Sequence, residues 1–128
     1  MRTQQDLEKY LFDSPYASEE VADGTWLVRD PSQPEDTIVV RAEDDLIVYR
    51  LKVLSASQIK DAPGLHKRLL QLNGADIAHG AYALVNGDVV ITAVARLDTL
   101  DAEELRSTID DFVLAVQNHR ATLKGYCA

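Results

Sequence analysis

The chain has 128 residues, of which 46% are hydrophobic and 27% are charged, and its formal net charge is −8. This length and composition suit one globular domain, exclude wholesale disorder, and leave no apolar run near the ~20 residues that span a bilayer. An acidic surface repels phosphate backbones, which argues against nucleic-acid binding. The polar start, Met1–Asp6, also has no signal-peptide core. We therefore expect a single domain over residues 1–128, located in the cytoplasm, that binds neither nucleic acid nor membrane.

The first half of the chain predicts a short helix followed by three antiparallel strands. Thr3 and Asp6 resemble an N-terminal helix cap, and Asp13-Ser14-Pro15 ends that helix. A polar stretch then leads to the Asp23-Gly24 turn. The expected strands cover residues 25–29, 37–42 and 46–54. Because the connections between them are too short for a crossover helix, neighbouring strands should be antiparallel.

The second half predicts a helix, a hairpin and a long final helix. The first of these helices begins near Pro63, and Asn73-Gly74 is expected to close it. Asn86-Gly87 is typical of a type I′ hairpin turn between strands 81–85 and 89–97. Asp101 with Glu104 resembles a capping box at the start of the last helix, which should bury Phe112. The fold class is therefore α+β, in the order α-β-β-β-α-β-β-α, with one antiparallel sheet flanked by helices.

Two of the predicted strands carry apolar residues on both faces, although a sheet with one wet face should alternate. Either a second subunit or partner covers the extra face, or helices of the same chain cover both faces. We favour the first alternative and predict a homodimer. The predicted dimer interface consists of Leu46, Val48, Val90, Thr92 and Val94.

No arrangement of residues predicts catalysis. His66, His79 and His119 lack a second histidine or cysteine at ligand spacing, so no metal site is predicted. The glycines form no phosphate-binding loop, no cofactor is expected, and no catalytic residue can be named. The single cysteine, Cys127, cannot form an internal disulfide and is expected on a frayed tail. The sequence therefore favours a binding domain over an enzyme.

Two stretches, Leu72–Leu84 and Leu97–Leu105, together with the order of elements, resemble the type III secretion chaperone-like fold. This group includes the Tir chaperone family and the YbjN-like bacterial proteins, and the resemblance covers residues 3–124. It implies an acidic homodimer that binds an extended segment of another protein. The partner-binding residues that the resemblance suggests are Leu7, Tyr10, Leu11, Trp26 and Val28.

The preferred interpretation is thus a non-enzymatic protein-binding domain, a small chaperone or regulator, and of the two branches we favour the YbjN-like one. The other protein that it binds is not identified by the sequence. The alternative is a small-ligand-binding protein or an enzyme, with a pocket roofed by the loop at residues 30–36.

Overall fold

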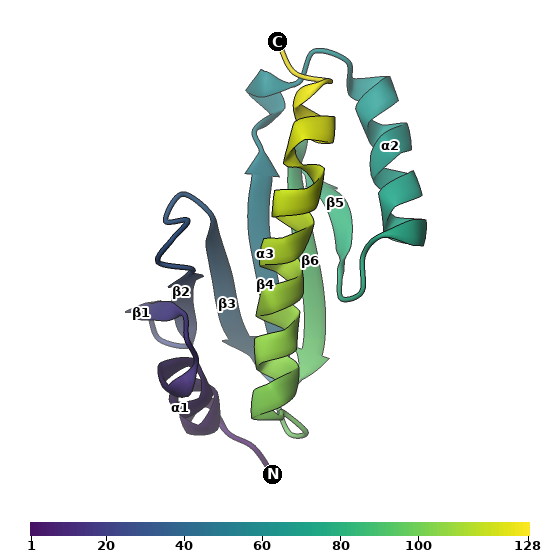
Figure 1. Cartoon of the computed structure of the whole chain (residues 1–128). Coiled ribbons are helices and arrows are strands. Elements are labelled where there is room, and N and C mark those ends of the chain that lie inside the picture. Colours follow the sequence, from purple (N-terminus) through teal and green to yellow (C-terminus); the bar gives the residue numbers. More distant parts are fainter.

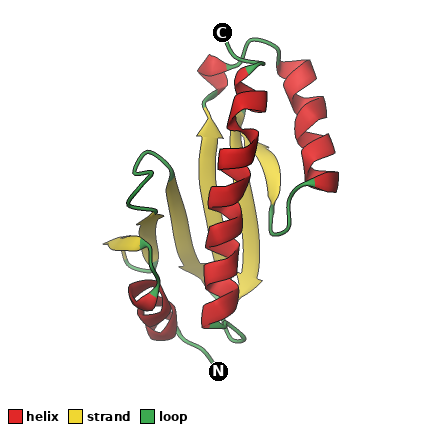
Figure 2. Cartoon of the chain, viewed as in Figure 1, coloured by secondary structure: helices red, strands yellow, loops and turns green.

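A computed structural model describes all residues from Met1 to Ala128 and contains one six-stranded sheet and three α-helices (Figures 1 and 2). The elements are α1 (Gln4–Asp13), β1 (Ala17–Ala22), β2 (Thr25–Arg29), β3 (Thr37–Glu43), β4 (Leu46–Leu54), a short 3₁₀ turn (Ala56–Gln58), α2 (Ala62–Ala75), β5 (Ala81–Val85), β6 (Asp88–Arg96) and α3 (Ala102–Lys124). This architecture confirms the predicted α+β class with a single antiparallel sheet.

The strands lie in the order β1-β2-β3-β4-β6-β5, and every neighbouring pair is antiparallel. The three strands predicted in the first half are present, and so is the hairpin, with Asn86 and Gly87 at φ angles of 52° and 85° as a type I′ turn requires. The structure adds one strand, β1, within the stretch interpreted as polar linker. All six of its residues are exposed, so it has no buried face whose alternation could have predicted it.

Of the three helix caps predicted from the sequence, two are present in the structure. The Asp6 carboxylate accepts a hydrogen bond from the Thr3 backbone N–H at 2.8 Å, and Asp101 accepts one from the Glu103 N–H at 2.7 Å. The predicted Asn73-Gly74 cap is wrong, because α2 continues through both residues to Ala75. The Asn73 side chain instead binds the backbone of Tyr82 in β5, donating to its carbonyl at 3.1 Å and accepting from its N–H at 2.7 Å.

All three helices pack on the same face of the sheet. Figure 1 shows α3 lying along β4 and β6, and the buried residues of α1 and α2 belong to the same apolar cluster of 24 residues as those of α3. On the strands, this cluster takes the side that holds Ile38, Val40, Ile47, Tyr49 and Ile91. Helices therefore do not cover both faces, and the opposite side of the sheet, called here the open sheet face, has no helix packed on it.

The C-terminal tail and the loop at residues 30–36 are both fixed to the rest of the fold. Lys60 and Asp61 donate backbone hydrogen bonds to the Tyr126 carbonyl at 2.9 and 3.1 Å, and Cys127 bridges to Ile59, so the tail is not frayed. The Arg120 guanidinium of α3 binds both carboxylate oxygens of Asp36, at 2.7 and 2.6 Å. The loop is thus held against α3 by a bidentate ion pair.

Candidate functional site

The residues that the resemblance suggested for partner binding lie mostly in the core. Leu7 and Leu11 of α1 and Val28 of β2 have no exposed surface, Trp26 is 3% exposed, and only Tyr10 is half-buried. The structure brings them together, because α1 packs its Leu7 and Leu11 face into the cluster that includes Trp26 and Val28. In this arrangement a partner reaches these side chains only after α1 moves away from the sheet, so their binding function stays a prediction.

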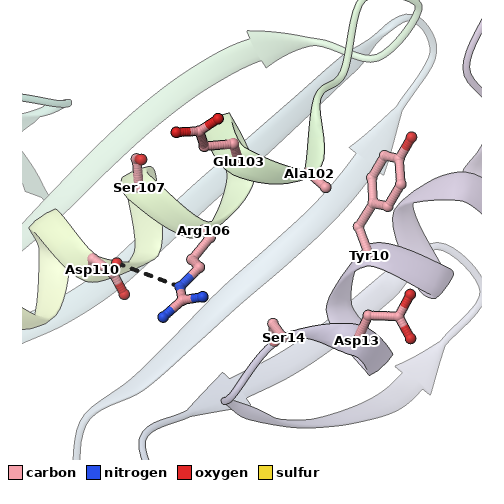
Figure 3. Close-up of a pocket in the computed structure, with 8 residues that line it drawn as sticks. All are labelled: Tyr10, Asp13, Ser14, Ala102, Glu103, Arg106, Ser107 and Asp110. Atoms are coloured by element: carbon pink, nitrogen blue, oxygen red, sulfur yellow. Dashed lines mark ion pairs between the residues drawn. The ribbon is translucent and has the colours of Figure 1, made fainter.

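Beside α1 lies a concave surface, the α1–α3 cleft, with a volume of about 590 Å³. Figure 3 shows Arg106 of α3 directed into the space between the two helices, with Asp13 and Ser14 at the end of α1 on the other side. The residues that line the cleft are Tyr10, Asp13, Ser14, Ala102, Glu103, Arg106, Ser107 and Asp110. No histidine or cysteine is among them, so its serines have no imidazole nearby to activate them.

The α1–α3 cleft is acidic. Its three carboxylates outnumber its one guanidinium, and Arg106 lies 3.9 Å from Asp110, one helical turn away. The Tyr16 hydroxyl also donates to Asp110, and burial together with this carboxylate raises the pKa of Tyr16. The contact anchors the segment after α1 to α3 and leaves the cleft with an excess of negative charge.

The open sheet face carries the exposed apolar residues of the central strands. Val48 of β4 pairs directly with Val94 of β6, and Leu46, at the start of β4, lies on the same side. Val94 is 60% exposed and Leu46 41% exposed. Val90, in contrast, is only 4% exposed, so it offers almost no area to a second molecule, while Thr92 donates to the Tyr49 carbonyl at 3.2 Å. The predicted dimer residues therefore share one face but differ in accessibility.

Basic side chains are concentrated on the open sheet face. The strand registers place five of them on this side of the sheet, against three acidic side chains, Glu19, Glu43 and Asp88, for a net charge of +2 in a chain of −8. The five basic residues are Arg29, Arg41, Arg50, Lys52 and Arg96. This cluster was not predicted from the sequence, although alternation along β4 puts Arg50 and Lys52 on the same side as Leu46 and Val48.

A third surface is an apolar groove between α2 and the edge strand β5, with a volume of about 260 Å³. Leu70 is 72% exposed there and Leu84 is 46% exposed. No acidic, lysine or arginine side chain lines it; the lining residues are His66, Leu69, Leu70, Asn73, Tyr82, Ala83 and Leu84. We call this surface the α2–β5 groove.

Next to this groove lies a chain of three polar side chains that joins three elements, with its imidazole and hydroxyl buried and its carboxylate exposed. The His119 Nδ1 atom is 2.7 Å from the Tyr82 hydroxyl, and its Nε2 atom is 3.5 Å from an Asp76 carboxylate oxygen. His119 and Tyr82 are each 5% exposed, and burial raises the pKa of the Tyr82 hydroxyl. Because the imidazole and hydroxyl are enclosed, the arrangement ties α3 to β5 and the end of α2 and presents no open position to a substrate.

Comparison with protein families gives one match over the whole chain: the CesT_Tir_1 model, which represents type III secretion chaperones, aligns with residues 1–128. The match is to the secretion chaperones and not to the YbjN-like branch that the sequence analysis preferred. No curated protein matches the chain.

Solved structures with a similar fold include chains from three protein complexes. The HopA1-SchA chaperone-effector complex contains a chain with a TM-score of 0.61 and 12% identity, covering 91% of this chain and 88% of its own length. The ExsC-ExsE complex contains a chain with a TM-score of 0.58 and 14% identity, and the alignment covers 96% of this chain and 97% of that one. The heterodimeric ExoU-SpcU complex from the type III secretion system of Pseudomonas aeruginosa contains a chain with a TM-score of 0.52 and 19% identity. The alignment covers 91% of this chain and 85% of that one. At these identities the likeness concerns the fold, and it confirms the chaperone-like architecture.

None of the three α-helices combines the length and the apolar character that a membrane-spanning helix needs.

Proposed function

Because the chain belongs to the CesT_Tir_1 family of type III secretion chaperones, we propose that it is a non-enzymatic chaperone that binds a segment of one particular secreted protein. The observation that carries this proposal is the open sheet face. A whole side of the sheet is left without helices while it still exposes Leu46 and Val94. Exposed apolar area beside charged residues is typical of a protein-binding surface.

The proposal includes a homodimer, and the α2–β5 groove suits it better than the open sheet face. A two-fold contact brings the same patch of both copies together. On the open sheet face, such a contact would bring Arg41, Arg50 and their neighbours close to their own symmetry mates. In the α2–β5 groove the same contact would bury Leu70 and Leu84, which are exposed in one copy, and none of the residues that line the groove is acidic, lysine or arginine.

Light scattering tests the dimer directly. The wild type should give a mass near twice 14.2 kDa over a tenfold dilution around micromolar concentration, and Leu70→Glu should give a monomer because it places a charge in the contact. Val94→Glu, which adds the same charge to the open sheet face, is the control and should remain dimeric. A wild-type mass of 14.2 kDa at every concentration would contradict the dimer.

Binding is tested by affinity capture of the partner from the native bacterium. Mass spectrometry identifies the captured protein, and the complex is then reconstituted from the two purified proteins. A stoichiometric complex with one secreted protein, and no turnover of it, is the expected result. If the purified chain instead co-purifies with a metabolite in the α1–α3 cleft and reconstitutes with no protein, the small-ligand alternative replaces this proposal.

A further inference from the structure

The central strands place basic side chains among their exposed apolar residues. One row across the open sheet face runs Leu27, Val39, Arg50 and Thr92, and the neighbouring row runs Arg41, Val48 and Val94. Positive side chains therefore separate two apolar pairs. A surface with this pattern is complementary to a segment in which negative and apolar side chains are interleaved.

The pairing of each cation shows which charges are available. Arg96 binds Asp45 at 2.8 Å, Arg41 binds Glu43 at 2.8 Å, and Lys52 lies 3.6 Å from Asp88. Arg50 lies at the centre of the face and is exposed, yet no carboxylate lies within 4.0 Å of it. An exposed guanidinium surrounded by apolar side chains retains its five N–H donors for a carboxylate from another molecule.

We propose that the open sheet face binds the partner segment through an acidic and apolar stretch, whose carboxylates pair with Arg50 and compete with Glu43 for Arg41 while its apolar side chains pack on Val39, Val48 and Val94. This inference rests on the proposed function and specifies the chemistry of its partner. The chain's total charge of −8 would suggest a basic partner, but the charge on this face has the opposite sign. A second copy is disfavoured here because like charges would meet.

Nucleic acid is the other polyanion that a basic face attracts. The face has no exposed aromatic side chain on which bases could stack, and the rest of the chain, at −10, repels a long phosphate backbone. Interleaved valines suit apolar side chains of a protein segment. An acidic protein segment is therefore the occupant that both the charge and the apolar pattern favour.

The test uses three fluorescein-labelled peptides of about twelve residues, long enough to extend ~40 Å. They are repeats of valine, glutamate and serine, and the same repeats with lysine or with glutamine in place of glutamate. Fluorescence anisotropy should rank their affinities as glutamate above glutamine above lysine, and added salt should weaken only the binding of the glutamate peptide. Equal affinities, a preference for lysine, or no binding by any of the three would overturn the proposal.

Charge reversal locates the binding. Arg41→Glu with Arg50→Glu should weaken the glutamate peptide at least about fivefold, as loss of two exposed charge pairs predicts. Lys60→Glu with Lys124→Glu makes the same change in net charge at exposed positions outside the sheet, and it should leave the affinity within about twofold of wild type. If both pairs of substitutions weaken binding equally, only net charge matters and the proposal fails.

Two further outcomes would also contradict it. If an oligothymidylate of similar length binds more tightly than the glutamate peptide, the face recognises nucleic acid. If Arg41→Glu with Arg50→Glu changes the mass measured by light scattering, the face joins two copies of this chain. The peptide titration does not need the natural partner, so the two proposals fail separately: a captured partner that binds the charge-reversed variant normally would overturn this inference and leave the chaperone function standing.

Discussion

The docking of α1 decides whether its apolar stripe belongs to the core or to a binding surface, and Leu7→Ser with Leu11→Ser tests it. Both leucines have 0% exposure and lie one helical turn apart on the face that meets the sheet. Removing a buried leucine costs about 2–5 kcal/mol. Since the two side chains are neighbours, their effects overlap, and we expect a loss of about 4–8 kcal/mol from the free energy of unfolding. That is a large part of the ~5–15 kcal/mol typical of a domain.

Other contacts of α1 replace little of this loss. The Arg2 guanidinium donates to the Leu100 carbonyl at 3.1 Å, and Gln4 donates to Asp23 at 3.1 Å in an exposed position. Hydrogen bonds of this kind contribute about 1 kcal/mol each. The two leucines are the only fully buried side chains of α1, so they are its largest single contribution to the packing on the sheet.

Urea denaturation followed by circular dichroism measures the loss, with Phe12→Ser as the matched control. Phe12 lies on the same helix but is 84% exposed, so its replacement should change the free energy of unfolding by less than about 0.5 kcal/mol. A double variant that unfolds at the wild-type urea concentration, yet no longer binds the partner, would refute the core assignment. It would show that α1 is a detachable binding element.

Three further results are expected. Phe112→Ala should cost about 3–5 kcal/mol in urea denaturation, because Phe112 is fully buried with its ring 6.3 Å from that of Tyr49; an unchanged midpoint would contradict this packing. Asn73→Ala should cost about 1–3 kcal/mol and speed amide hydrogen exchange in β5, because both of its bonds to the Tyr82 backbone are lost. Burial raises the pKa of Tyr49 and Tyr82 above 10 in the folded state, so thermal stability should be constant up to about pH 10 and fall above it; a flat profile to pH 11 in the wild type would exclude this linkage.

The strands and turns were largely predictable because their signals are local. Asn86-Gly87 between two apolar strands favours the positive φ angles of a tight hairpin turn, and strand β4 alternates its buried Ile47, Tyr49 and Leu51 with residues of the other face. In contrast, β1 has no buried residue, and its pairing with β2 rather than any alternation of its own residues defines it as a strand. Long-range pairing of this kind is outside the reach of a periodicity argument.

The end of α2 and the binding surfaces show a different limit. Asn73-Gly74 has the composition of a helix cap, but the Asn73 side chain instead makes two hydrogen bonds to the backbone of Tyr82 in β5, nine residues further along the chain, and the helix continues. The apolar residues of the open sheet face were found from the sequence because two-sided hydrophobicity is visible within one strand. The cations were not, because Arg41 and Arg50 become neighbours only through the pairing of β3 with β4.

One-sided packing connects this fold with its function. With every helix on one face, the core is complete without any contribution from Val48 or Val94, so these residues are free to serve a partner. An uncovered apolar sheet face also favours aggregation, and the long stems of Arg41 and Arg50 reduce that risk by covering apolar neighbours while keeping charge in water. The same guanidinium groups then select among partners, since an apolar segment without carboxylates would have to desolvate them without compensation. Stability thus resides on the helical side of the sheet, and recognition is left to the side where the positive charge is concentrated.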